Sequence, residues 1–204
     1  MKSKQVYSQW IASVEDRWAS LGVSKLPGKG CKWRADVHDL TLLIFVEVNS
    51  KYAWTVQGGG NFSINAYLPT TKPEHPGKYV ESVFDSIAFF SLWSDELKAQ
   101  RLELNRQVFE KIQALDKTEL YAKMAEAYDC TPEEAKQSGL YESELEIIAM
   151  DVDDPVDALI NPPLYFYDSE DLVAWAELVT AAMPQVLARV GDDVERAFNT
   201  GDAN

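Results

Sequence analysis

Histidine and cysteine, which often reveal metal or redox sites, are scarce in this sequence. Its 204 residues include two of each. Two imidazoles exclude metal sites built from three or more histidines. Neither His38 nor His75 has a glutamate three residues before it, as the paired Glu-x-x-His motifs of di-iron bundles require. Cys31 and Cys130 lie far apart and form no Cys-x-x-Cys pair, which indicates two separate thiols in a reducing cytosol.

Long apolar runs are also missing. The longest extends over residues 40–46 and stops at Glu47, whereas a membrane-spanning helix needs about 20 apolar residues. Polar residues between Ser8 and Asp16 interrupt the stretch where a secretion signal would have its apolar region. We therefore predict a cytoplasmic protein that does not bind membranes.

Basic residues are few in the second half of the chain. Residues 94–204 contain 9 Lys/Arg and 25 Asp/Glu, a net charge of −16, while residues 1–93 contain 10 and 8, a net charge of +2. Between Asp129 and Glu177 there are fourteen carboxylates and one base, Lys136. Because a surface of one sign attracts partners of the opposite sign, the second half predicts a basic partner and argues against nucleic acid.

Four basic residues do gather in the first half, around a glycine-rich turn: Lys25, Lys29, Lys32 and Arg34. Read functionally, they form a small phosphate-binding patch. A net charge of −14 repels anions at long range, so the simpler interpretation pairs them with the protein's own acidic half. That pairing could occur within one subunit or between the subunits of a homo-oligomer.

The apolar fraction of 46% and the six tryptophans are sufficient for a single folded domain over residues 1–204. Apolar residues at steps of four from Val6 to Trp18 predict a first helix that ends at Gly22. The period then changes to two, which predicts strands over 31–36, 40–49 and 61–68. Residues 51–57 would be a fourth strand or a hairpin arm. On the last of the three predicted strands, four apolar residues share one face: Phe62, Ile64, Ala66 and Leu68.

The pattern is mostly helical from Ser94, a predicted N-cap, to the end. Thr131-Pro132-Glu133-Glu134 is a compact helix start with a capping box, and 141–150 is predicted to be a further helix. Residues 164–167 would add an edge strand, and Ser169 would cap a final helix that Pro184 kinks or restarts. The predicted class is α+β. It has an N-terminal helix and a three- to four-stranded antiparallel meander (1–93), then an acidic, mostly helical half packed on the sheet (94–204).

Several short segments resemble an uncharacterised bacterial family known as domain of unknown function 4304. They are Leu21-Gly22, Trp33-Arg34, Leu40, Ile44-Phe45-Val46 and Phe62-Ser63-Ile64-Asn65. The resemblance covers roughly the first 70 residues and the closing helix. It implies a helix before a meander and a helical segment at the end, and because the family has no established activity it implies no function.

Three motifs suggest ligands and then fail on their details. Asp153-Asp154-Pro155-Val156-Asp157 has the Asp-Asp-x-x-Asp form that holds magnesium in prenyl-transferring enzymes, but Pro155 interrupts the helix that this chemistry needs and no second motif exists. A calcium loop starting at Asp151 would have Val156 where glycine is required. Gly58-Gly59-Gly60 lacks the following lysine of a phosphate loop. We therefore predict no metal and no cofactor.

Two interpretations of the acidic region remain open: a solubilising surface, or a docking surface such as small acidic bacterial proteins use to neutralise a toxin. The leading hypothesis is a non-catalytic, immunity- or adaptor-like module that binds a basic protein. Its candidate binding residues are Glu133, Glu134, Glu142, Glu144, Asp151, Asp153, Asp154 and Asp157.

The alternative hypothesis is a small hydrolase or transferase with a pocket over the meander. Glu47, Asp36 or His38 would act as acid or base, and Trp54 or Tyr52 would form a substrate platform. A deep cleft around Glu47 would favour this enzyme, whereas a solvent-facing Glu47 would remove its main candidate.

Overall fold

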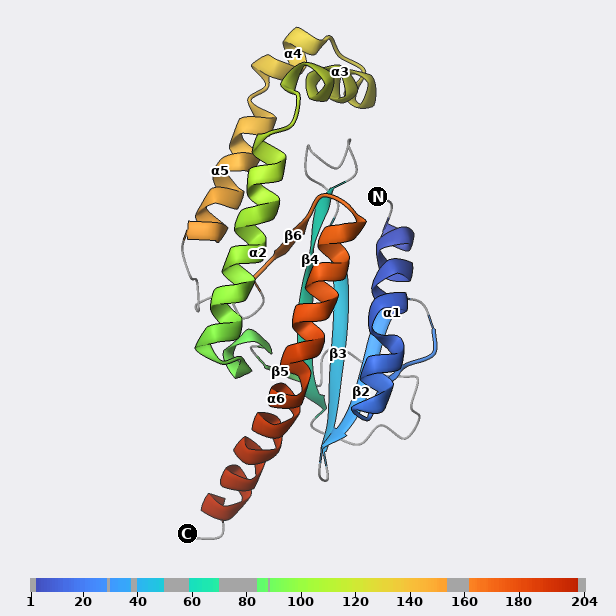
Figure 1. The fold of residues 1–204 in the computed structure, drawn as a ribbon, viewed down its shortest axis with the longest axis vertical. Coiled ribbons are helices and arrows are strands. Elements are labelled where there is room, and N and C mark those ends of the chain that lie inside the picture. The colour runs from blue at the N-terminus through green and yellow to red at the C-terminus, as the bar shows by residue number, and fades with distance from the viewer. Residues whose placement is uncertain are drawn as a thin grey trace.

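Six strands form one antiparallel sheet, and helices cover one of its faces (Figure 1). The computed structural model describes residues 3–28, 30–37, 40–49, 59–69, 84–87, 89–153 and 162–201. The side chains of 40, 68–69, 84–87, 151–153 and 191–201 stand outside this description. The α+β class predicted from the sequence is confirmed: a helix, a sheet and a mostly helical second half follow one another along the chain.

The first helix, α1 (Ser3–Ser20), forms as its apolar spacing predicts. Residues four apart lie on one side of a helix, and the four that define the stripe are all buried: Val6, Trp10, Val14 and Trp18. Gly22, just past its end, has a φ of 79°. Glycine adopts this left-handed conformation without the steric cost that a Cβ would add. The helix therefore ends where the sequence predicts.

The sheet contains the predicted meander and extends it at both sides. Its order is β1 (Val23–Lys25), β2 (Cys31–Val37), β3 (Leu40–Asn49), β4 (Gly60–Pro69) and β5 (Phe84–Ile87). The short β1 and β5 were not predicted. The predicted edge strand at 164–167 is confirmed as β6 (Leu164–Phe166), which pairs with Gly60–Phe62 of β4, while β5 pairs with Ala66–Pro69. Two short strands thus share one edge of β4. Residues 51–57 lie outside the described residues.

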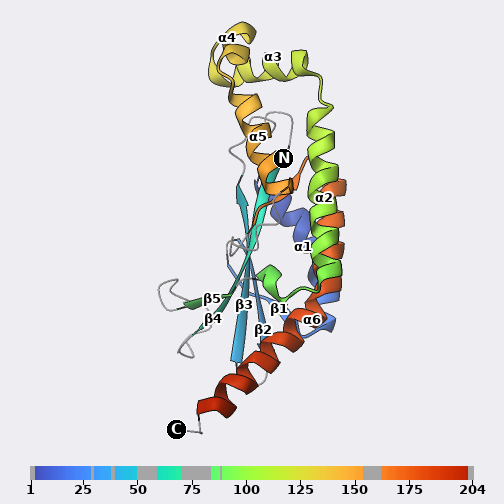
Figure 2. The ribbon, with the colours of Figure 1, turned by 90° about the vertical axis from the view of Figure 1, so that its left-hand side faces the viewer.

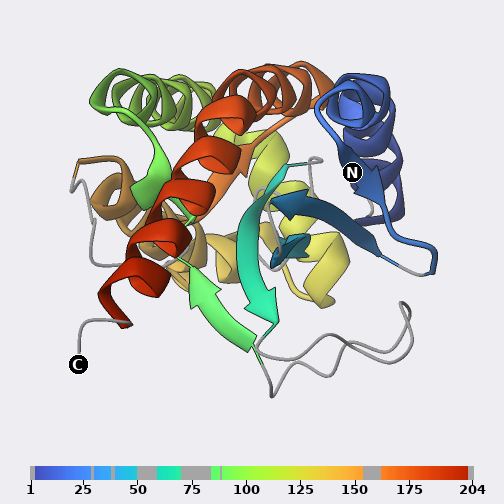
Figure 3. The same cartoon turned by 90° about the horizontal axis from the view of Figure 1, so that it is seen from below.

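The main core lies between the sheet and the layer formed by α1, α6 (Ser169–Gly201) and α2 (Asp95–Gln113), which Figure 3 shows end-on. Alternate residues of the three long strands face it. Trp18 and Trp33 meet edge to face with ring centroids 4.9 Å apart, and Trp10 and Phe62 do so at 5.1 Å. Each large side chain that leaves water contributes roughly 1.5–3 kcal/mol before the entropy cost of folding. This aromatic contact fixes α1 against β2 and β4.

The remaining helices begin largely as their capping residues predict. After a 3-10 turn, η3 (Phe89–Leu92), the hydroxyl of Ser94 accepts a hydrogen bond from the N–H of Leu97 at the start of α2. Then follow α3 (Lys117–Tyr128), α4 (Pro132–Gln137) and α5 (Leu140–Asp153). Thr131 and Glu134 form the predicted capping box of α4, and the predicted helix at 141–150 lies within α5.

The final helix corrects one prediction. Ser169 is its first residue rather than its cap, because the carboxylate of Asp168 accepts hydrogen bonds from the N–H groups of Glu170 at 2.8 Å and Asp171 at 3.1 Å. Pro184 lies inside the helix, which continues to Gly201 and changes direction along its course (Figure 2). Of the two predicted effects of Pro184, a kink or a restart, the continuous bent helix agrees with the kink.

A second, smaller core holds α3, α4 and α5 together; α3 and α4 lie at one end of the molecule, and α5 runs from them alongside α2 (Figure 1). We call these three helices the helical arm. Their apolar side chains pack against Val108 and Ile112 of α2 and Tyr165 of β6. The second half therefore packs on the sheet mainly through α6, while α3 and α4 extend past the end of the sheet (Figure 1). No helix within the described ranges has the length and apolar character needed to cross a membrane.

Candidate partner-binding surface

The predicted acidic residues occupy different parts of the arm. Glu133 and Glu134 are exposed on α4, and Glu142 is exposed in the first turn of α5. The carboxylate of Glu134 accepts hydrogen bonds from the N–H of Thr131 at 2.7 Å and from its hydroxyl at 2.8 Å. These two bonds hold the pKa of Glu134 below its ordinary value. Glu134 therefore helps to cap and stabilise α4, although its charge stays on the surface.

Glu142 is also engaged within the arm. It accepts a hydrogen bond from the hydroxyl of Tyr121 on α3. Desolvation of the phenol, and then the adjacent Glu142 carboxylate, raise the pKa of Tyr121 to about 12. The hydroxyl of Tyr141 donates to the carbonyl oxygen of Ile112 at 2.7 Å. These bonds fix α5 against α3 and α2, so the exposed face of α5 is presented by a well-anchored helix.

Glu144 lies inside the molecule, with 6% of its surface exposed. It comes three residues after Tyr141 and four before Ile148, both buried, and so shares their side of α5. Asp151 and Asp153 are in the last turn of α5, where only the backbone is described, and Asp154 and Asp157 lie outside the described residues. Since α5 is about 20 Å long at 1.5 Å per residue, the described members of the predicted set, from Glu133 to Asp153, are spread over α4 and α5 rather than gathered in one compact patch.

Sequence reasoning missed the apolar part of this surface. The described residues include three exposed large apolar side chains, and all three belong to the arm: Tyr128 on α3 at 56% exposed, and Ile147 and Met150 on α5 at 42% and 61%. A signal existed, because Ile147 and Met150 fall outside the buried stripe that Tyr141 and Ile148 define. Burying Ile147 and Met150 would require a second neighbour on the other side of α5.

The exposed side of α5 therefore carries two kinds of residue in neighbouring rows. Glu142 and Glu146, four residues apart, form an acidic row, and both are exposed. Ser143, Ile147 and Met150 follow the spacing i, i+4, i+7 beside it. We call these five residues the α5 face. Residues 116–153, which span the arm, contain 3 basic and 11 acidic residues, a net charge of −8.

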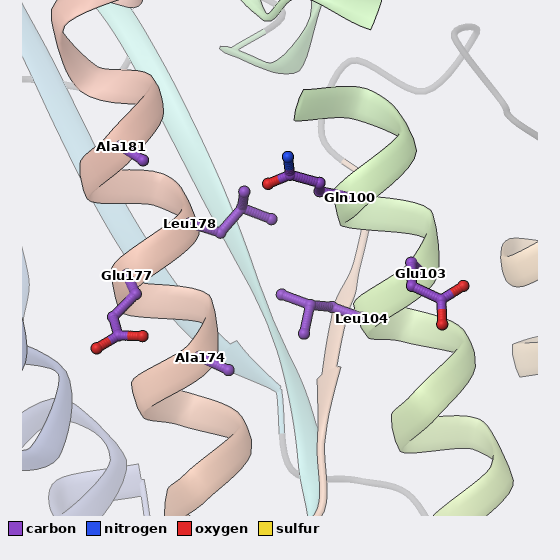
Figure 4. Close-up of a pocket in the computed structure, with 7 residues that line it drawn as sticks. All are labelled: Gln100, Glu103, Leu104, Ala174, Glu177, Leu178 and Ala181. Carbon is purple, nitrogen blue, oxygen red and sulfur yellow. The ribbon is translucent and has the colours of Figure 1, made fainter. Parts of the chain in front are cut away.

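A shallow groove of about 440 Å³ lies elsewhere, between α2 and α6 (Figure 4). Leu104 and Leu178 point towards one another across it, while the carboxylates of Glu103 and Glu177 point away. Glu103 pairs with Arg106 at 2.7 Å, and Glu177 lies 4.0 Å from Arg17. Because these bases offset the local carboxylates, the groove lacks the one-sided charge of the arm.

The groove between α2 and α6 does not include Glu47 or Asp36, the two described acid or base candidates of the enzyme hypothesis. Glu47 is exposed on β3 and accepts a hydrogen bond from the amide of Asn65 at 2.8 Å. Asp36 pairs with Arg34 at 2.8 Å and accepts a hydrogen bond from Thr41. His38, Tyr52 and Trp54 lie outside the described residues. The solvent-facing Glu47 removes the main candidate acid or base of that hypothesis.

Two of the four basic residues around the glycine-rich turn have partners within the sheet. Lys32 places its ammonium 4.8 Å from the centre of the Phe45 ring, and Arg34 pairs with Asp36 of its own strand. Lys29 lies outside the described residues. Within the part of the chain that the structure describes, no three His, Cys, Asp or Glu side chains are grouped as a metal ion would need.

Comparison with protein-family models, curated proteins and solved structures gives no match, so the resemblance to domain of unknown function 4304 stays a prediction. The functional argument therefore depends on the arrangement of this chain's own residues.

Proposed function

We propose that this protein is a non-catalytic binding module that holds a basic protein against its helical arm. The observation that carries the proposal is the placement of Tyr128, Ile147 and Met150, all three exposed on the arm. Scattered exposed apolar residues are normal on a folded protein, but Ile147 and Met150 lie three residues apart on one side of α5, and neighbouring exposed apolar side chains are typical of an interaction site.

Apolar area and charge would have separate roles in such a complex. Covering Ile147 and Met150 would contribute roughly 25 cal/mol for each Å² of apolar surface removed from water. The net charge of −8 on residues 116–153 would speed the encounter with a basic partner and repel acidic ones. A purely solubilising surface would not explain Ile147 and Met150, because exposed apolar side chains lower the solubility of a protein.

The arm is also built to keep its shape without a partner. Its own core includes Leu120 and Met124 of α3, Ala135 of α4 and Tyr141 of α5, all buried. A preformed surface loses less conformational entropy on binding than a disordered one. An immunity-like or adaptor-like role, in which one rigid acidic surface covers a basic partner, agrees with this construction.

The test is a pull-down from a lysate of the cells that make the protein, with wild type and the double variant Ile147→Gln, Met150→Gln as baits. Met150→Gln keeps the side-chain length and helix propensity, and Ile147→Gln introduces a slightly better helix former, so both remove apolar surface without weakening the helix. Glu177→Gln, which removes an exposed charge outside the arm, is the matched control. Washes at about 0.05 M and about 0.5 M salt separate electrostatic from apolar retention.

We expect wild type and the Glu177→Gln control to retain the same basic protein at low salt, and the double variant to lose it. If the double variant retains the same proteins as wild type at both salt concentrations, the arm is not the binding surface and the proposal is wrong. A partner with an acidic contact surface would contradict it as well.

A further inference from the structure

We infer that the element docked on the α5 face is an amphipathic helix of the partner, with an apolar stripe bordered on one side by lysines or arginines. This inference rests on the proposed function and narrows it from a basic protein to the structural element that makes the contact.

The rows on α5 define the shape of the contact. Ser143, Ile147 and Met150 form a ridge along the helix axis, with a small side chain at one end and large apolar ones towards the other. Ridges of this spacing pack into the grooves of a second helix, at interaxial distances of 8–10 Å. The small Ser143 lets the partner's backbone approach at one end, while Ile147 and Met150 fill its grooves.

The alternatives to a helix lack a counterpart on the arm. An added strand needs an open sheet edge to supply main-chain hydrogen bonds, and the described residues of the arm are helices and the turns that join them. The main-chain groups in the middle of α5 are satisfied within the helix. Contact must therefore be made through side chains, and the ridge from Ser143 to Met150, about 10 Å long, matches about two turns of a partner helix.

Charge sets which side of the partner helix must be basic. Glu142 and Glu146 lie to one side of the apolar row, so the partner's basic residues must lie on the corresponding side of its stripe. Glu142 already accepts a hydrogen bond from Tyr121. Glu146 is therefore the residue of the acidic row that we expect to pair with a basic residue of the partner. A second copy of this chain is disfavoured as the occupant, because two chains of net charge −14 repel each other.

The inference can be tested with two synthetic peptides of about 14 residues, enough to span α5. Both have the same leucines and lysines. One places leucine at i, i+3, i+4 and i+7, and in the other the same residues are rearranged so that no stripe exists. Binding is measured by titration calorimetry and peptide helicity by circular dichroism, using wild type, the Ile147→Gln, Met150→Gln variant, Glu146→Gln and the Glu177→Gln control.

We expect the amphipathic peptide to bind wild type at least about tenfold more tightly than the rearranged one, a 1.4 kcal/mol preference, and to gain helicity on binding. The double variant should lose this preference. Glu146→Gln should weaken binding of the amphipathic peptide and reduce its salt dependence, while Glu177→Gln should behave as wild type.

Equal binding of the two peptides to wild type would overturn the helix inference, and so would an unchanged preference in the double variant. These outcomes are separate from failure of the proposed function. If the captured cellular protein still depends on Ile147 and Met150 while neither peptide is preferred, the arm binds a basic protein through something other than a helix. If capture of the protein does not depend on Ile147 and Met150, both the proposed function and the helix inference are wrong.

Discussion

Asn105 of α2 accepts a hydrogen bond from the backbone N–H of Tyr165 at 3.0 Å and donates its own amide to the carbonyl oxygen of Pro163 at 3.2 Å. One side chain thus holds the segment that enters β6. β6 itself joins the two cores: Leu164 and Phe166 face the main core, and Tyr165 faces the core of the arm. The position of the arm relative to the sheet depends on this short strand.

The substitution Asn105→Ala should therefore destabilise the protein. It would leave the buried N–H of Tyr165 without its acceptor, and an unsatisfied buried donor costs about 1–3 kcal/mol. Chemical denaturation measures the loss. Gln107→Ala, on the same helix but exposed and bonded to Glu103, is the control and should change the free energy of unfolding by less than about 0.5 kcal/mol. Equal effects of the two variants would contradict the proposed role of Asn105.

The indole N–H of Trp18 donates a hydrogen bond of 2.9 Å to the hydroxyl of Thr180. We expect its removal to lower the stability of the protein as well. Thr180→Val keeps the shape of the side chain but removes the acceptor beneath a fully buried tryptophan. We expect a loss of about 1–3 kcal/mol in the free energy of unfolding. Thr180→Ser retains the oxygen and should recover part of the loss; if serine is no better than valine, packing rather than the hydrogen bond explains the effect.

Asp168 should contribute a pH-dependent part of the stability. Burial opposes its charge, but the N–H of Asp171 and then the charge of Lys111 outweigh this and hold the pKa of Asp168 below its ordinary value of 3.8. A carboxylate with a lowered folded-state pKa contributes stability above its unfolded-state pKa, and that contribution is lost as the pH falls through the folded-state pKa.

The variant Asp168→Asn keeps a capping oxygen but removes the charge. At pH 7 it should be less stable than wild type by about 0.5–1 kcal/mol, a modest figure because the ion pair with Lys111 is partly exposed. Below the folded-state pKa of Asp168 the difference should disappear, since both side chains are then neutral. Denaturation series at several pH values measure this, and a difference that is constant with pH would show that the charge has no part in it.

The two cysteines should react at very different rates. Burial is the main reason that the pKa of Cys31 is raised to about 11, and its side chain is almost fully enclosed. Because the thiolate is the reactive form, Cys31 should react with a thiol reagent at pH 8 only when the protein unfolds, whereas the half-buried Cys130 should react first. Cys130→Ser should abolish the fast phase. A fast phase that survives in this variant would mean that Cys31 is accessible.

The sequence predicted the elements with strong local signals. The stripe from Val6 to Trp18, the alternation in β4 and the capping box at Thr131 each depend on several residues that agree. β1 and β5, with three and four residues, are too short to show a period. The cap of α6 was misplaced by one residue because aspartate and serine are both good caps, and only the geometry shows which of them accepts the N–H groups.

The candidate surface was predicted by charge alone and therefore incompletely. Charge counting treats Glu144 and Glu146 alike, although one is buried and the other exposed, because their positions around α5 differ by more than half a turn. It also passes over Ile147 and Met150, which look like core residues until the neighbours of α5 are known. Which side of an amphipathic helix stays uncovered depends on tertiary packing, and a single sequence does not contain that packing explicitly.

The bond between Trp18 and Thr180 joins residues 162 positions apart in the chain, and β6 meets β4 across about a hundred residues. During synthesis, α1 and the strands therefore emerge long before the helix and strand that cover them. The contacts among α3, α4 and α5 are closer in sequence, so they can form before the contact of the arm with Tyr165 of β6. A chain truncated before residue 162 would lack β6 and α6, and the tryptophans of α1 would lose the helix that covers them.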